Sequence, residues 1–140
     1  MTHHHRQAGF TLIEILVVLT VLGIVAGIAI GAFPQRGGRL DVAAAAVDVA
    51  DALRLGRAQS IDFGTPVTFS LDSDGHGYLI GRQHRALPAA VMAAMAGPAE
   101  IRFDRLGGAN GGAVRIVGRA LMMLVRVDWL TGRVVVEEAS

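Results

Sequence analysis

One acidic side chain lies inside the longest apolar run of this sequence. Residues 10–33 read FTLIEILVVLTVLGIVAGIAIGAF, and Glu14 is the single ionisable side chain among them. An acid within a membrane helix costs about 2.5–3.5 kcal/mol on insertion scales, so it is usually retained for a partner. We therefore expect Glu14 to pair with a cation. The alternative is that Glu14 lies at the membrane surface, where the helix starts.

The other candidate residues indicate less chemistry. Asp72, Asp74 and Gly77 fit three positions of a calcium loop, but His76 and Gln83 stand where oxygen ligands belong. A hairpin turn explains the same residues without a metal. Cysteine is absent, which excludes disulfides and thiolate sites. No Ser-His-Asp or paired-acid arrangement is recognisable, so we expect neither an enzyme nor a bound metal or cofactor.

Arginine supplies every basic side chain, thirteen in all, and the net charge is only +1. Eight of these arginines lie in the C-terminal half: Arg82, Arg85, Arg102, Arg105, Arg115, Arg119, Arg126 and Arg133. If several lined one face, they could hold DNA phosphates. Acidic residues are interleaved with them, however, and aromatic stacking groups are few. Solvated strand faces are therefore the simpler interpretation.

The apolar run around Glu14 has the length of a membrane helix. At about 1.5 Å per residue it spans roughly 36 Å, and a hydrocarbon core is about 30 Å thick. A secretory signal peptide has a shorter apolar region, of about 7–15 residues, and lacks an acid. Arg6 favours a cytoplasmic N-terminus, whereas Arg36 and Arg39 favour the opposite orientation. Charge counting alone therefore leaves the orientation open.

Three glycines recur every four residues within this run. Gly23, Gly27 and Gly31 fall on one face of a helix, in the small-xxx-small arrangement that lets membrane helices approach closely. The alternative is that glycine is simply common in membrane helices. We expect the three glycines to form a helix-packing face.

The segment after the apolar run predicts a second helix. The sequence PQRGG at residues 34–38 interrupts the helical pattern, which resumes over residues 40–61. Val42, Ala46, Val49, Leu53 and Gly56 form an apolar stripe at helical spacing, which we expect to pack on the rest of the domain.

From residue 67 onward the apolar period changes from 3.6 to 2, which predicts strands. We expect them at residues 67–71, 78–80, 101–103, 113–117, 121–127 and 134–137. Residues 87–97 stay open between a short helix and a loop. The predicted fold is α+β: a long N-terminal helix, membrane-spanning in its first half, packed on a small antiparallel β-sheet head.

Residues 6–14, Arg-Gln-Ala-Gly-Phe-Thr-Leu-Ile-Glu, resemble the type IV prepilin cleavage signature. The resemblance implies that a prepilin peptidase cuts between Gly9 and Phe10 and that Phe10 becomes N-methylated. It also implies that Glu14 and Thr11 serve filament assembly, Glu14 by neutralising the new N-terminal amine of a neighbouring subunit. The expected organisation is a cleaved cytoplasmic leader (1–9), a transmembrane helix and filament core (10–33), a linker with the periplasmic part of the helix (34–64) and a periplasmic head (65–140).

Shorter motifs in the head resemble minor pseudopilin H of type II secretion and the related FimT-like minor pilins. They are FSLDSDG at residues 69–75, IRF at 101–103 and LTGRV at 130–134. The resemblance implies a structural subunit of the pseudopilus that helps export folded proteins across the outer membrane. Its partners would be other pseudopilins, the prepilin peptidase and the bacterial inner membrane. The alternative is a FimT-like minor pilin of a type IV pilus or DNA-uptake machine, which would bind DNA through the head arginines.

Overall fold

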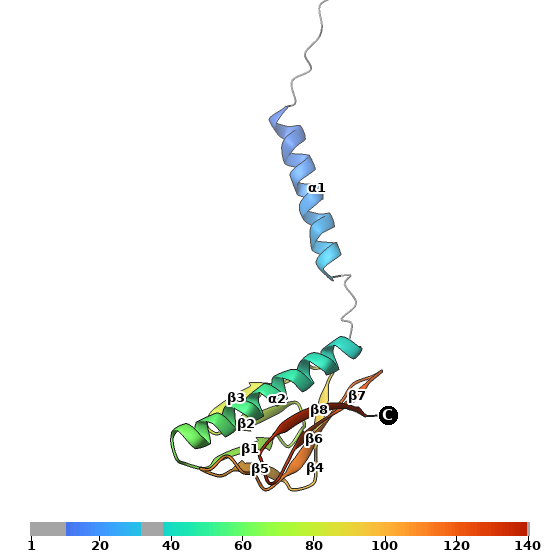
Figure 1. The fold of residues 1–140 in the computed structure, drawn as a ribbon. Helices are drawn as coiled ribbons and strands as arrows, with labels where there is room; N and C mark the ends of the chain where they lie inside the picture. The colour runs from blue at the N-terminus through green and yellow to red at the C-terminus, as the bar shows by residue number, and fades with distance from the viewer. Residues whose placement is uncertain (1–10, 32–37, 140) are drawn as a thin grey trace, which may run out of the picture. The chain divides into compact units, whose positions relative to one another are not determined.

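The computed structural model describes residues 11–31 and 38–139, and the chain divides into two units, Met1–Gln35 and Arg36–Ser140. The first unit contains helix α1 (Leu12–Gly31) and the second contains helix α2 (Arg39–Asp62) and a set of strands (Figure 1). The strands are β1 (Val67–Leu71), β2 (Gly77–Ile80), β3 (Gln83–Ala86), β4 (Met92–Ala96), β5 (Glu100–Phe103), β6 (Gly112–Val117), β7 (Met122–Val127) and β8 (Val134–Ala139).

Helix α2 confirms the helix predicted at residues 40–61. All five members of the predicted apolar stripe are buried. The helix ends where Phe63 caps it and Gly64 follows with φ +61°, a left-handed conformation that glycine adopts at low cost. The stripe therefore marks the face by which α2 packs on the sheets, as predicted.

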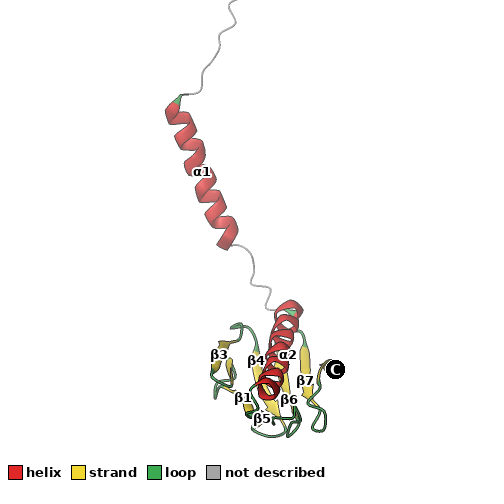
Figure 2. Cartoon of the chain, turned by 60° about the vertical axis from the view of Figure 1, so that its left-hand side comes forward, coloured by secondary structure: helices red, strands yellow, loops and turns green. Residues whose placement is uncertain are grey.

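The strands form two antiparallel sheets. Sheet A has the strand order β3-β2-β1-β5 and sheet B has the order β4-β6-β7-β8. Helix α2 contacts strands of both sheets and lies across them (Figure 2). A backbone hydrogen bond of 2.8 Å from Ala93 N–H to the Gly75 carbonyl joins β4 to the β1–β2 turn. One helix thus covers the inner faces of two sheets that together make the head.

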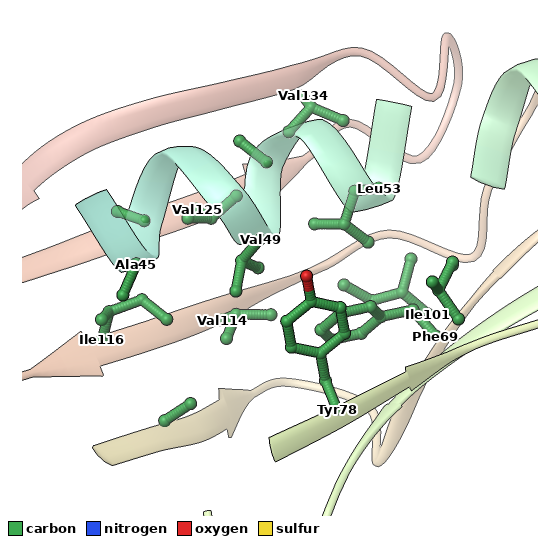
Figure 3. Close-up of a cluster of buried hydrophobic side chains, with 14 of the residues drawn as sticks. Ala45, Val49, Leu53, Phe69, Tyr78, Ile101, Val114, Ile116, Val125 and Val134 are labelled. Atoms are coloured by element: carbon green, nitrogen blue, oxygen red, sulfur yellow. The ribbon is translucent and has the colours of Figure 1, made fainter. Parts of the chain in front are cut away.

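The core lies between α2 and these inner faces. Leu53, Phe69 and Ile101 are fully buried, and the labelled side chains from both sheets converge on the helix (Figure 3). Every residue of the core cluster falls between residues 42 and 134. The second unit therefore has its own hydrophobic core and can be expected to fold without α1.

One polar contact connects α2 to sheet A inside this core. The Tyr78 side chain is fully buried, and its hydroxyl donates a 2.8 Å hydrogen bond to the Asp48 carboxylate. Its ring centroid lies 5.3 Å from that of Phe69. Burial, and then the hydrogen bond to Asp48, raise the pKa of Tyr78 above its usual range. Asp48 also lies 3.6 Å from the guanidinium of Arg85.

The six predicted strands are confirmed, but the head differs from the prediction in two respects. It has two sheets rather than one, and sequence reasoning missed β3 and β4. Every residue of β3 is exposed, so this edge strand has no apolar alternation to reveal it. In β4, Met and Ala favour helix, but residues 87–97 are bracketed by Pro88 and Pro98 and are too short for a stable isolated helix. Pairing with β6 makes the segment a strand instead.

Helix α1 coincides with most of the predicted membrane segment. Among the described residues, no helix meets the length and hydropathy expected of a membrane span. The predicted span of residues 10–33 begins and ends outside the described residues.

Candidate functional site

Glu14 lies in the first turn of α1, where the backbone of Thr11 starts the helix. The Glu14 N–H donates to the Thr11 carbonyl at 3.0 Å, and the Ile15 N–H donates to the same oxygen at 3.3 Å. A carboxylate in the first turn is favoured because the helix dipole places partial positive charge there. In the described part of the chain, the Glu14 carboxylate has no hydrogen-bond or ion-pair partner. The Glu14 side chain is exposed in this part of the chain.

Thr11 has a structural role that the sequence reasoning missed. Its hydroxyl oxygen lies 3.4 Å from the Glu14 N–H, in the position of a helix N-cap. The spacing Thr11-x-x-Glu14 is that of a capping box, a signal that was readable in the sequence. Thr11 thus supports the helix start that holds Glu14, which is a structural reason for its place in the motif.

Apart from Glu14 and Thr20, the described side chains of α1 are apolar. Every described side chain from residue 11 to residue 26 is exposed, including Leu12 at 87% and Ile13 at 70%. A helix that is apolar all round requires lipid or partner helices around it, because water is a poor solvent for such a surface. The exposed surface of α1 is thus suited to burial by other molecules.

The predicted packing glycines belong to this helix. Gly23, Gly27 and Gly31 all lie within α1, and among the described residues a Cβ added at Gly23 would meet nothing within 4 Å beyond its neighbours and the nearby backbone of its own helix. The space beside Gly23 is therefore available to a neighbouring helix. The predicted cleavage residues Gly9 and Phe10, including the methylation site at Phe10, lie outside the described residues.

The head places its arginines on several surfaces. All eight arginines of the sequence prediction are exposed. Arg102 lies in β5 of sheet A, while Arg115 and Arg126 lie in sheet B. Arg126 pairs with Glu137 at 3.4 Å. The structure therefore distributes these arginines over both sheets and their loops and does not gather them on one face.

Two of the three head motifs of the sequence prediction contain turns, whereas IRF at residues 101–103 lies in strand β5. The predicted β1–β2 hairpin turn is confirmed: Asp72 N–H donates to the Gly77 carbonyl at 2.9 Å, and His76 N–H donates to the Asp74 carboxylate at 3.0 Å. Asp72 also lies 2.7 Å from the imidazole of His84. Within the described ranges, no three His, Asp or Glu side chains are grouped closely enough to hold a metal ion.

The turn between β7 and β8 is organised by Asp128. Its carboxylate accepts hydrogen bonds from the backbone N–H of Thr131 at 2.8 Å, the Thr131 hydroxyl at 2.8 Å and the Leu130 N–H at 3.0 Å. These bonds, those from Thr131 first, lower the pKa of Asp128. The LTGRV motif at residues 130–134 is thus a turn that positions β8.

Comparison with known proteins agrees with these observations. The family described as "Prokaryotic N-terminal methylation motif" matches residues 4–30. Type II secretion system protein H of Xanthomonas campestris pv. campestris is 27% identical, and the alignment covers 96% of this chain and 90% of that protein.

Two crystal structures of the type IV minor pilin FimU of Pseudomonas aeruginosa share the fold. The first has a TM-score of 0.62 at 15% identity and covers 74% of this chain and 92% of that one. The second has a TM-score of 0.58 at 14% identity and covers 67% and 90%. The chain is therefore similar to prepilin-like proteins in its N-terminal methylation motif, and its head has the fold of a minor pilin.

Proposed function

We propose that this chain is a minor pseudopilin, a structural and non-catalytic subunit of a type II secretion pseudopilus. The observation that carries the proposal is its similarity to type II secretion protein H along nearly the whole chain, combined with the methylation motif at residues 4–30. In this proposal the head is periplasmic, α1 anchors the chain in the inner membrane, and other pseudopilins and the prepilin peptidase are its partners.

The assembly step follows from charge. Cleavage between Gly9 and Phe10 would create an amine at Phe10, which is then methylated, four residues before Glu14 in the sequence. The open carboxylate of Glu14 would neutralise the corresponding amine of a neighbouring subunit. A buried charge without its partner costs several kcal/mol, so subunits that retain residues 1–9 would be excluded from the filament.

Close packing of α1 helices would use the glycine face. Because a Cβ at Gly23 would meet no other described side chain within 4 Å, Gly23→Leu should leave the single helix intact. We expect the variant to be processed normally but to assemble less, because the leucine blocks a neighbouring helix. Ile24→Leu, which changes an adjacent exposed position without adding bulk, is the matched control. Equal assembly of both variants would contradict a packing role for this face.

Processing is tested by intact mass. Co-expression with a competent prepilin peptidase should remove residues 1–9 and add one methyl group to Phe10. A product that retains the leader in the presence of active peptidase would overturn the cleavage assignment.

The function itself is tested in a clean deletion strain. Secreted enzyme activity in the medium is compared with twitching motility and DNA uptake. We expect loss of secretion alone, restored by the wild-type gene and by Thr20→Ala in α1 but not by Glu14→Ala. Thr20 is a suitable control because, among the described residues, its hydroxyl donates to the Leu16 carbonyl of its own helix, at 2.7 Å.

A minor pilin of a type IV pilus or DNA-uptake machine is the second candidate, because the head has the fold of the minor pilin FimU. Under this alternative the exposed head arginines would contact DNA phosphates. Intact secretion with lost motility or transformation in the deletion strain would move the assignment to the pilus. A DNA affinity of the head that falls steeply with salt would then support the arginine contact.

A further inference from the structure

The outer face of sheet B, the face turned away from α2, is unusually apolar. Alternation along the strands and the pairing register place twelve residues on it, in three rows across the four strands. Nine of the twelve are apolar, and only Arg115, Arg126 and Glu137 carry charge. The large apolar members are Met92, Val117, Met122, Leu124 and Val135, and the remaining four are alanines.

Sheet A of the same head provides an internal comparison. Its outer face carries mostly polar side chains, Thr68 and Ser70 on β1, Glu100 and Arg102 on β5 and His84 on β3, with Leu79 on β2 as its large apolar member. This is the usual pattern of an antiparallel sheet with one face in the core and one in water. Sheet B instead has strands such as MMLVRV and VVVEEA, which resemble strands covered on both faces.

Much of the apolar face is open in the described second unit, although Ala113 is buried and Met122 and Leu124 are half-buried. Met92 is 53% exposed, Val117 39% and Val135 37%. Because α2 packs on the opposite face, against Val125 and Val134, it contributes no cover here. An exposed contiguous apolar patch of this kind marks an interaction site.

The charges on the face indicate the chemistry of its partner. Arg115 and Glu137 lie in the middle row on either side of Leu124, and Arg126 is one row away. Glu137 pairs with Arg126 at 3.4 Å, so it is already engaged. Arg115 is exposed and, within residues 38–139, has no acidic partner. A complementary surface would therefore be apolar with an acidic side chain opposite Arg115.

The area of the face limits the kind of partner that could bind it stably. Four strands about 4.8 Å apart and six residues long give roughly 19 by 20 Å, or about 380 Å². A stable complex of free soluble proteins buries about 800 Å² on each partner. The face therefore suits a contact between chains that are already held side by side, since tethering raises their effective concentration. The apolar surface of α1 would hold neighbouring chains side by side.

We propose that the outer face of sheet B docks on the head of a different pilin-like subunit, which presents an apolar surface with an acidic side chain opposite Arg115. The inference rests on the proposed function, because that function supplies the co-anchored neighbour. A second copy of this chain is a poorer fit, since two such faces would each bring a net charge of +1. A lipid surface is also poorer, because Arg115 and the Arg126–Glu137 pair would lose water without gaining an acid.

Site-specific photocrosslinking of the full chain in its native cells tests the proposal. The photoreactive residue p-benzoylphenylalanine replaces Leu124 at the centre of the face, and in a control it replaces Ser70 on the outer face of sheet A. We expect an adduct from the variant at position 124 and none from the variant at position 70. Mass spectrometry of the adduct should identify the crosslinked protein as another chain with an N-terminal methylation motif. Arg115→Glu should lower the adduct yield by about tenfold, because the new glutamate would face the acidic side chain of the partner and the two negative charges would repel each other. Arg102→Glu, an equal charge change on sheet A, should leave the yield unchanged.

Three results would overturn the docking surface: no adduct from Leu124, an adduct with a second copy of this chain, or an adduct with a protein that lacks the methylation motif. Equal yields from the two arginine variants would overturn the acidic complement. Secretion by the wild-type strain, compared with the deletion strain, tests the proposed function separately. If that strain secretes normally and the deletion strain does not, a failed crosslink counts against this surface and leaves the function standing.

Discussion

Removing the donor of the hydrogen bond between Tyr78 and Asp48 should lower the free energy of unfolding by a different amount than removing its acceptor. Tyr78→Phe keeps the buried ring against Phe69 and leaves Asp48 without a donor. The Asp48 side chain is 42% exposed, so it can regain water, and we expect a loss of about 0.5–1.5 kcal/mol in the free energy of unfolding. Asp48→Ala instead leaves the hydroxyl of the fully buried Tyr78 without an acceptor.

The second loss should be larger, in the range of about 1–3 kcal/mol for an unsatisfied buried group. A cavity of about 120 Å³ lined by Asp48, Tyr78 and Arg85 lies beside the hydroxyl, so water can enter and the lower half of that range is expected. Loss of the exposed contact with Arg85 adds little. Asp48→Asn retains an acceptor and should lie nearest to wild type, and the double variant should cost less than the sum of the two single changes.

Urea unfolding of residues 36–140, followed by circular dichroism, measures these losses. A loss for Tyr78→Phe equal to or greater than that for Asp48→Ala would refute the asymmetry. Strict additivity in the double variant would refute the contact itself.

The same contact predicts an alkaline effect that can be assigned to one side chain. The chain has one tyrosine, no cysteine and no lysine, so Tyr78 is the side chain that titrates above about pH 9. Its pKa is raised in the folded state, so its stabilising contribution is complete below the unfolded pKa of about 10 and is lost as pH rises beyond that value. Tyrosinate absorbance should therefore appear only with unfolding, and the alkaline loss of stability should vanish in Tyr78→Phe. Tyrosinate forming near pH 10 in the folded head would contradict the burial argument.

Three further predictions follow from the described contacts. Leu53→Ala should lower the free energy of unfolding of the head by about 2–5 kcal/mol because it opens a cavity in the core, whereas Leu55→Ala, at a position 46% exposed, should change it by less than about 0.5 kcal/mol in the same urea assay. Because the pKa of Asp128 is lowered in the folded state, its contribution to the free energy of unfolding is present above its ordinary pKa of 3.8 and is lost as pH falls through the lowered value. Between pH 5 and pH 2, stability should therefore fall less steeply in Asp128→Asn than in wild type. An unchanged profile would contradict this role. In sheared filament fractions, Glu14→Ala should reduce incorporation at least about a hundredfold, since an unpaired buried amine costs several kcal/mol. Thr11→Ala should remove only the helix cap, which is worth about 1 kcal/mol, and should reduce incorporation a few-fold. Similar levels for the two variants would argue that Glu14 acts only within its own helix.

Several elements could be read from the sequence because their side chains repeat with the period of the backbone. The stripe of α2 predicted its buried face, alternation predicted β1, and the turn at Asp72–Gly77 placed β2 after it. Local turn chemistry predicted the hairpin at Asp72–Gly77, whose hydrogen bonds join residues a few positions apart. The candidate site belongs to the same class. Glu14 stands out because its charge is isolated in an apolar run, and this is visible without any tertiary contact.

What only the tertiary structure decided depends on partners that are distant in the chain. The edge strands β3 and β4 are held by backbone pairing with β2 and β6, and backbone pairing leaves no side-chain period to read. The division into two sheets, and the contact of Tyr78 with Asp48 thirty residues away, follow from the way α2 covers both inner faces. The outer face of sheet B is the clearest case. A run such as MMLVRV is equally compatible with a strand buried on one face or on both, and only the packing of α2 on one side shows which apolar residues are left for a partner.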